Sequence, residues 1–219
     1  NTQYELCPTY PSLFAAPARA SDATVHECAQ FRTKARLPMF CWAHKNGSSL
    51  WRCSQPRVGV SATRNVADEQ MLAEIRKTNP SSTPLYICDC RPKVNAYANR
   101  AKGGGFEFSG HYRNSELHFQ EIGNIHVMRG SLEKLERVVM SNGAHDLTWN
   151  SSIAESQWYA HVANVLYSSV RVCNEIVRKK RTVLVHCSDG WDRTPQISGM
   201  PKRALYHSQK SPKLLSKEI

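Results

Sequence analysis

A cysteine and an arginine stand six positions apart late in the chain, in the run His186-Cys187-Ser188-Asp189-Gly190-Trp191-Asp192-Arg193-Thr194. A loop of this length can turn successive backbone N–H groups toward one centre, where they bind an anion, and the planar guanidinium of Arg193 can hold two phosphate oxygens. The same positive field favours the thiolate form of Cys187. The spacing therefore predicts a phosphate-binding loop in which Cys187 attacks phosphorus and forms a phosphocysteine.

An attack of this kind also needs proton transfer. An acid protonates the leaving alkoxide, and a base activates the water that hydrolyses the thiophosphate. Asp192 is the nearest candidate inside the loop, and Asp189 could orient the substrate or replace it. The plainer interpretation is a surface cysteine in an ordinary turn, followed by an unrelated arginine. The buried strand before the loop, the glycine at position 190 and the two acids in so short a segment favour the phosphate-binding interpretation.

Such a loop requires a strand before it and the start of a helix after it. Residues 182–186 form an uninterrupted apolar and β-branched run, typical of a central strand buried on both faces. Apolar spacing predicts the longest helix over residues 153–180, directly before that strand. We further expect helices over 22–32, 66–77 and 95–101, strands over 85–89 and 125–128, and a hairpin of strands 38–42 and 50–54. Strands that alternate with helices predict an α/β fold with a largely parallel sheet.

The composition is that of one folded domain. The chain has 219 residues and a mass of 24.7 kDa, and its 41% hydrophobic and 21% charged residues exclude a disordered or coiled-coil chain. No apolar run reaches the roughly twenty residues of a membrane span, and no secretory signal is visible. A net charge of +11 favours anionic partners such as nucleic acid, acidic lipid or phosphorylated substrates.

The cysteines and glycines outside the loop give weaker signals. Disulfide frameworks are typical of short secreted chains, and a zinc site needs paired ligands, whereas Cys88-Asp89-Cys90 stands alone. Reduced cytosolic thiols, several of them buried, fit the eight cysteines better. The run Gly103-Gly104-Gly105 lacks the lysine and the spacing of a nucleotide-binding loop, so we expect a flexible surface turn there.

Five motifs resemble, in the same order, the catalytic domain of the myotubularin-related lipid phosphatases. They are Tyr4-Glu5-Leu6-Cys7-x-Thr9-Tyr10-Pro11, Arg52-Cys53-Ser54-Gln55-Pro56 with Val58-Gly59-Val60-Ser61, Arg91-Pro92-x-Val94-Asn95-Ala96 with Ala98-Asn99-x-Ala101-Lys102-Gly103-Gly104-Gly105, Asn124-Ile125-His126-Val127-Met128-Arg129, and the loop at 186–194. The resemblance implies a cysteine-dependent, protein-tyrosine-phosphatase-like fold, with a central, largely parallel sheet flanked by helices. It implies removal of the 3-phosphate from phosphatidylinositol 3-phosphate and phosphatidylinositol 3,5-bisphosphate, with no metal and no cofactor.

The resemblance also assigns roles by position. It makes Cys187 the nucleophile, Arg193 the phosphate clamp and Asp192 the general acid. It places the substrate-binding groups at Ser188, Asp189, Gly190, Trp191, Asn99, Asn124 and Ile125. For the last three, the residues alone leave open a helix-capping asparagine or a core isoleucine. The implied partners are a phosphoinositide, an anionic endosomal-type membrane contacted peripherally from the cytoplasm, and a homo- or heterodimeric relative.

After Thr194 the chain departs from the family pattern. The family continues into a long apolar helix, whereas here Gly199 and Pro201 predict a helix of only one or two turns, followed by a basic tail. We therefore expect a C-terminally truncated phosphatase domain over residues 1–199 and a disordered tail over 200–219, as a splice variant or premature stop would leave. The short helix also predicts marginal stability and weak or absent turnover.

Three alternatives to a lipid phosphatase follow from the same residues. The first is a catalytically incompetent pseudophosphatase fragment that binds phosphoinositide or dimerises with an active relative, which the short helix would favour. The second is a protein-tyrosine phosphatase, disfavoured because those enzymes usually take their acid from a separate loop. The third is a nucleic-acid binder, which rests on charge alone, since no interleaved basic and aromatic pattern is visible. Nucleic acid is therefore not an expected partner.

Overall fold

A five-stranded sheet forms the centre of the computed structural model. The structure describes residues 1–141 and 147–210, and residues 206–210 by their backbone alone. The strand order is β1-β2-β5-β3-β4. Only the β1–β2 pair is antiparallel; β2, β5, β3 and β4 run parallel. The strands are β1 (Met39–Ala43), β2 (Ser49–Cys53), β3 (Leu85–Asp89), β4 (Ser115–Phe119) and β5 (Val183–His186). The α/β fold with a largely parallel sheet is therefore confirmed.

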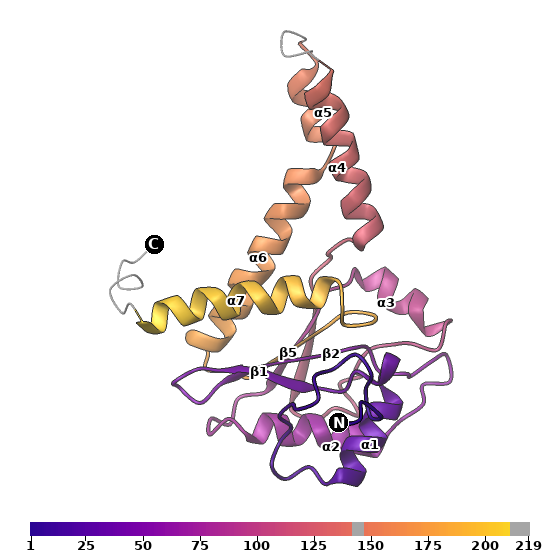
Figure 1. Ribbon diagram of the computed structural model, residues 1–219, viewed down its shortest axis with the longest axis vertical. Helices are drawn as coiled ribbons and strands as arrows, with labels where there is room; N and C mark the ends of the chain where they lie inside the picture. The colour runs from indigo at the N-terminus through magenta and orange to yellow at the C-terminus, as the bar shows by residue number, and fades with distance from the viewer. Residues whose placement is uncertain (142–146, 211–219) are drawn as a thin grey trace.

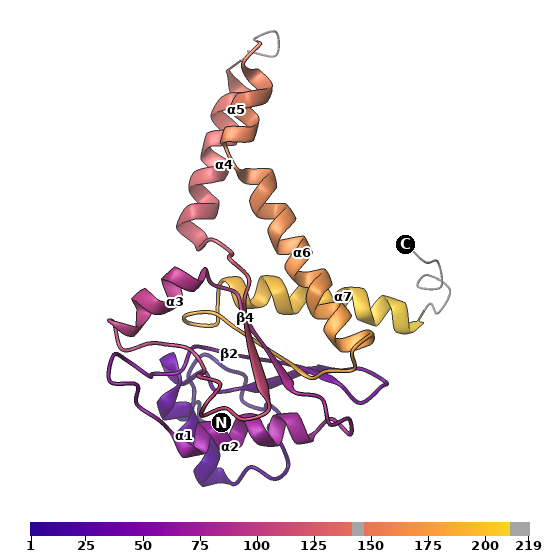
Figure 2. The same ribbon diagram turned by 180° about the vertical axis from the view of Figure 1, so that it is seen from behind.

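Helices cover both faces of this sheet (Figure 1). One face packs on α1 (Asp22–Phe31) and α2 (Val66–Lys77), and the other packs on α6 (Trp158–Val177) and α7 (Arg193–Lys210). Alternate residues of β5 divide between the two cores, with Leu184 on the α2 side and Val183 and Val185 on the α6 side. The remaining helices are the 3₁₀ turn η1 (Thr33–Ala35), α3 (Lys93–Arg100), α4 (Ile125–Met140) and α5 (Trp149–Glu155). Helices α4, α5 and the start of α6 project from the sheet as an arm (Figure 2).

Several expected elements are confirmed, and two of the helices begin with a side-chain cap. Ser21 caps α1, and the predicted hairpin forms β1 and β2. Asn65 caps α2 by accepting a hydrogen bond from the N–H of Asp68, and acidic residues occupy its first turn and basic ones its last. The predicted strands at 85–89 and 182–186 become β3 and β5.

The strand expected at residues 125–128 is wrong. These residues form the first turn of α4, because Asn124 caps that helix by accepting hydrogen bonds from the N–H groups of His126 and Val127. A run of four residues, three of them apolar, is too short to distinguish a strand from a helix turn. The missing strand is β4 (Ser115–Phe119), whose serine, glutamate and histidine concealed it.

The long helix expected over residues 153–180 is interrupted. Helix α5 ends at Glu155 and α6 begins at Trp158, with Gln157 between them in the left-handed region at φ 62°. The break separates α5, at the tip of the arm, from α6, which continues toward the sheet (Figure 1). Apolar spacing continued through this break and did not reveal it.

The expectation of a one- or two-turn helix after the loop is also wrong. Helix α7 runs for 18 residues through Gly199 and Pro201 to Lys210. Ile197, Pro201 and Leu205 are buried at helical spacing, and Ile197 and Leu205 belong to the core that α7 shares with α6 and the sheet. Tertiary packing outweighs the poor helix propensity of glycine and proline here.

The length of α7 also changes what was expected of the domain. A short helix would have left the phosphate loop without support, and weak turnover and marginal stability were inferred from this. Because α7 is long, that inference loses its basis. The division at residue 199 stays a prediction, although residues 200–210 are helical rather than disordered and 211–219 lie outside the described residues. No helix of the described ranges has the length and apolarity to cross a bilayer.

Candidate active site

Three parallel strands end together and bring three loops to one edge of the sheet. Cys53 of β2 and Asp89 of β3 both lie in register with His186 of β5. Segments that leave the carboxyl ends of neighbouring parallel strands must meet, and this is where α/β proteins bind ligands. The phosphate loop, residues 187–193, is the central one of the three.

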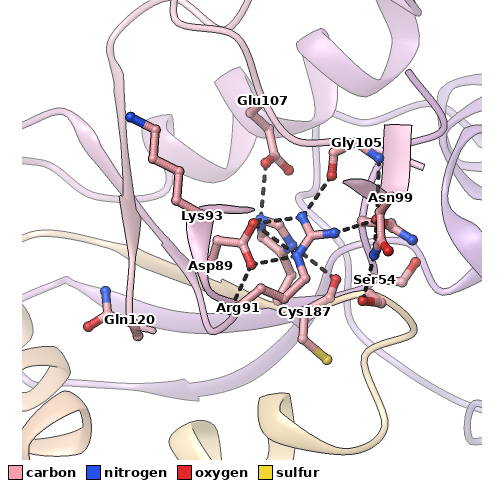
Figure 3. Close-up of polar contacts among 12 residues, drawn as sticks. Ser54, Asp89, Arg91, Lys93, Asn99, Gly105, Glu107, Gln120 and Cys187 are labelled. Atoms are coloured by element: carbon pink, nitrogen blue, oxygen red, sulfur yellow. Dashed lines mark hydrogen bonds and ion pairs between the residues drawn. The ribbon is translucent and has the colours of Figure 1, made fainter. Parts of the chain in front are cut away.

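Cys187 lies at the base of the phosphate loop. The residue is buried beside Val185 in the core under α7. The Thr194 hydroxyl, in the first turn of α7, lies 3.1 Å from its sulfur and donates to it. In Figure 3 the sulfur points away from the polar cluster behind the loop. A donor and a helix N-terminus beside the sulfur suit a thiolate. All eight cysteines are described, and none forms a disulfide.

The carbonyl groups of the phosphate loop are held outward by fixed donors. The Ser188 carbonyl accepts from the N–H of Gln55 at 3.0 Å, and the Asp189 carbonyl accepts from Arg36 Nη1 at 2.5 Å. The Gly190 carbonyl accepts from Arg52 Nη2 at 2.6 Å. Within the described part of the chain, nothing accepts a hydrogen bond from the N–H groups of residues 188–191. Outward carbonyls and unpaired N–H groups are the arrangement of an anion-binding nest.

Gly190 is the one loop position that only glycine can occupy. Its φ is 74°, and a Cβ built there would lie 2.5 Å from the carbonyl oxygen of Cys53. Both the left-handed backbone and the close approach of β2 exclude a side chain. The sequence-level inference that this glycine shapes the loop therefore has a specific physical basis.

Arg193 closes the loop and keeps spare donor capacity. Its guanidinium is buried, and its contacts are long: 3.4 Å to the Ile122 carbonyl, 3.4 Å to Ser188 Oγ and 3.9 Å to Asp192 Oδ2. The buried Nε atom has no hydrogen-bond acceptor within residues 1–141 and 147–210. A buried, unpaired guanidinium N–H is costly unless an anion binds there.

Asp192 is held between the loop and the start of α4. One carboxylate oxygen accepts from the N–H of Ile125 at 3.2 Å, and the other accepts from the side chain of Gln196 at 3.2 Å. Both bonds fix the carboxylate beside Arg193. The structure thereby brings Ile125 and the capping residue Asn124 to the loop, although each has a local role that needs no substrate.

The other expected substrate contacts also surround the loop. Asn99 donates to Ser188 Oγ at 2.8 Å. Ser188 and Asp189 are half-buried, and Trp191 is 53% exposed at the rim. All ten predicted site residues therefore gather at one edge of the sheet, and their individual roles in catalysis and binding stay predictions.

A buried ionic network behind the loop escaped the sequence analysis. Arg32 contacts Asp68 at 2.6 Å and Glu107 at 2.7 Å, and Glu107 lies 3.0 Å from His186 Nε2, an ion pair rather than an aligned hydrogen bond. His186 Nδ1 lies 3.2 Å from the Cys187 carbonyl. Side chains alternate between the two faces of the sheet along β5, and this could have shown that His186 faces the opposite core from Cys187. Nothing near His186 in the sequence indicated its charged partners.

The network shifts the ionisation of its members. Burial alone would raise the pKa of Glu107, but His186 and Arg32 hold that pKa well below its usual range. Burial alone would lower the pKa of His186, but Glu107 and then Asp89 raise it above the usual value. An imidazolium at position 186 can donate from Nδ1 to the Cys187 carbonyl, which connects the network to the loop.

The glycine run at 103–105 is not a free surface turn at all its positions. A Cβ on Gly104 would lie 2.5 Å from Gln55 Oε1, and one on Gly105 would lie 2.8 Å from the Val58 side chain. Gly103, at φ 80°, has open space around it. The expectation of a flexible turn is therefore wrong for Gly104 and Gly105, which pack against the segment after β2.

Comparison with known proteins gives one consistent family. The model of the myotubularin-like phosphatase domain matches residues 1–205. "Myotubularin" from Xenopus laevis is 46% identical over 201 residues, covering 91% of this chain and 33% of that protein. "Phosphatidylinositol-3,5-bisphosphate 3-phosphatase MTMR2" from Bos taurus is 43% identical over 201 residues, covering 91% of this chain and 31% of that protein. The chain thus spans about a third of the length of these relatives.

Proposed function

The chain belongs to the myotubularin-like phosphatase family, and on that premise we propose that it removes the 3-phosphate of phosphatidylinositol 3-phosphate and phosphatidylinositol 3,5-bisphosphate. The observation that carries the proposal is the phosphate loop itself. A buried cysteine begins a loop whose next four N–H groups, like the buried Nε of Arg193, have no acceptor among the residues that the structure describes. This combination suits a tetrahedral dianion attacked by sulfur.

In the first step the Cys187 thiolate attacks phosphorus and forms the S–P bond. The bond from phosphorus to the inositol oxygen breaks, and Asp192 gives its proton to that oxygen. The loop N–H groups and Arg193 bind the three remaining phosphate oxygens, where negative charge is held in the transition state. The hydrogen bond between Thr194 and the sulfur stabilises the thiolate before attack.

In the second step water replaces sulfur. Asp192, now a carboxylate, takes a proton from the attacking water, the S–P bond breaks, and inorganic phosphate leaves while Cys187 returns to the thiolate. One carboxylate can serve both steps because its contacts with Ile125 and Gln196 keep it beside the loop. No step requires a group from outside the chain other than the substrate and water.

The proposed setting of this activity rests on the family resemblance and is consistent with the charge of the chain. We propose, from the resemblance, that the chain works on endosomal-type membranes, contacted peripherally from the cytoplasm, and its net charge of +11 favours such an anionic surface. Charge attracts such a surface but does not choose among anions, so the phosphate loop supplies the specificity. A dimer with a related family member remains part of the proposal.

A comparison of four substrates tests the proposed function. We expect the 219-residue chain to hydrolyse phosphatidylinositol 3-phosphate and phosphatidylinositol 3,5-bisphosphate in vesicles with a kcat/KM at least about 100-fold above that for a phosphotyrosine peptide. The kcat/KM for the free inositol 1,3-bisphosphate head group should lie between these values. Released phosphate is the measurement. A preference for the peptide would contradict the proposal in favour of a protein phosphatase. Vesicle binding without phosphate release would instead favour the catalytically incompetent binder.

A further inference from the structure

The side-chain oxygen of Gln55 receives N–H groups from three other segments. Arg91 Nη1 donates to it, as do Asn99 Nδ2 at 3.2 Å and the N–H of Gly105 at 3.2 Å. Gln55 is buried and lies on the segment that leaves β2, next to the phosphate loop. We propose that Gln55 and Asn99 form a relay that positions the phosphate loop through Ser188.

The oxygen of Gln55 is fixed by a buried cation. Arg91 is fully buried and binds Asp89 through Nε and Nη2 at 2.9 and 2.6 Å, while Nη2 also donates to the Gly105 carbonyl at 2.7 Å (Figure 3). Its remaining nitrogen, Nη1, donates to Gln55. Arginine and backbone N–H groups can only donate, so the atom they meet on Gln55 must be the oxygen. The same reasoning makes the atom of Asn99 that meets this oxygen its nitrogen.

Asn99 has no free N–H left for a ligand. A carboxamide nitrogen carries two hydrogens. One is donated to Gln55 and the other to Ser188 Oγ at 2.8 Å. A substrate oxygen could take a hydrogen from Asn99 only if one of these bonds broke.

Ser188 is therefore held at two points. The backbone N–H of Gln55 donates to its carbonyl, which keeps that carbonyl outward, and Asn99 donates to its hydroxyl. Because Ser188 directly follows the cysteine, its orientation decides where the first N–H groups of the nest point. Gly104 supports the arrangement, since any side chain there would displace the Gln55 carboxamide.

A substrate-free measurement can test this relay. The relay rests on the proposed function only in assuming that the loop binds anions. The readout is therefore a ratio of two rates: alkylation of Cys187 by iodoacetate divided by its alkylation by iodoacetamide. Both reagents have similar size, but only iodoacetate carries a negative charge that the loop can attract. Mass spectrometry of the Cys187 peptide gives both rates on the 219-residue chain.

We expect the unaltered chain to prefer iodoacetate, and we expect Asn99→Ala to lower the ratio about fivefold to tenfold, as loss of one hydrogen bond predicts. Gln55→Met, which keeps the volume but removes the acceptor, should lower it similarly. The double variant should fall no further than the more affected single variant, because both act through Ser188. Asn95→Ala, one helical turn earlier on the exposed side of α3, is the matched control and should leave the ratio unchanged.

The outcomes separate the two proposals. If the unaltered chain prefers iodoacetate and Asn99→Ala keeps that preference, the positioning role of Asn99 is wrong. If the unaltered chain shows no preference, the anion-binding loop and with it the proposed function are contradicted, and the relay falls with them. Gln55→Met leaves Arg91 Nη1 without its acceptor, so that variant could fail to fold. Asn99 is half-buried at the surface of α3, so Asn99→Ala keeps the experiment decisive in that case.

Discussion

We expect Cys187→Ser to reduce phosphate release from phosphatidylinositol 3,5-bisphosphate by at least about 10⁴-fold, the scale on which loss of a covalent nucleophile acts. A serine hydroxyl at neutral pH is protonated and much less nucleophilic than a thiolate, and the loop supplies a stabilising field rather than a strong base. The measurement is initial rate of phosphate release at saturating and at low substrate.

Substrate binding and folding should survive this change. The serine hydroxyl can keep the hydrogen bond that Thr194 now makes with sulfur, and the N–H groups of residues 188–191 are unaltered. Cys173→Ser, at a half-buried position on α6, is the matched control and should retain full activity. Residual turnover within about tenfold of the unaltered chain would mean that Cys187 is not the nucleophile.

Glu107→Gln should lower the free energy of unfolding by about 3 kcal/mol near pH 6, the lower end of the range for a buried ion pair broken on one side. The glutamine keeps the volume but leaves Arg32 with one carboxylate partner, Asp68, among the described residues. It also removes the main counter-charge of His186. The cost stays at the lower end because the imidazole can lose its proton. Urea unfolding of both chains measures the difference.

The same variant should change the pH dependence of stability. The raised pKa of His186 contributes stability that is complete below about pH 6.5 and is lost as pH rises through the folded pKa. The lowered pKa of Glu107 contributes stability that is present above about pH 4.3 and is lost as pH falls through the folded pKa. Without Glu107, burial should dominate the pKa of His186 and depress it. The fall in stability from pH 6 to pH 8 should then shrink or reverse.

Glu133→Gln is the matched control, because Glu133 is half-exposed in a surface pair with Arg129. Exposed pairs of this kind contribute roughly 0.5 kcal/mol or less, so neither stability nor its pH dependence should change much. If Glu107→Gln left both the free energy of unfolding and its pH dependence unaltered, the ionic network behind the loop would not stabilise the fold.

The parts of the site that depend on short-range pattern were predictable. The spacing of Cys187 and Arg193, after an apolar run, indicated the strand, the loop and the start of a helix, and the helix predicted to begin at residue 22 does begin there, capped by Ser21. Each of these signals lies within a few residues of the element it specifies. The family resemblance added the more distant residues Asn99 and Asn124.

The parts that depend on tertiary contacts were not predictable. Pro201 argued against a long helix, yet packing on α6 and the sheet carries α7 past it. Asn124 was considered as a helix cap, but the apolar residues after it were assigned to a strand. Arg91 and Glu107 carry charges that a sequence places at the surface by default, and only their partners from other segments explain their burial.

Trapping the covalent intermediate on Cys187 tests the proposed phosphocysteine mechanism most directly. We predict that the 219-residue chain, mixed with phosphatidylinositol 3,5-bisphosphate and quenched in acid within the first turnover, carries a phosphoryl group on the Cys187 peptide, detected by mass spectrometry, and that the group disappears as inorganic phosphate accumulates. Phosphate release at a measurable rate, with the Cys187 peptide unmodified at every time point, would contradict a phosphocysteine mechanism.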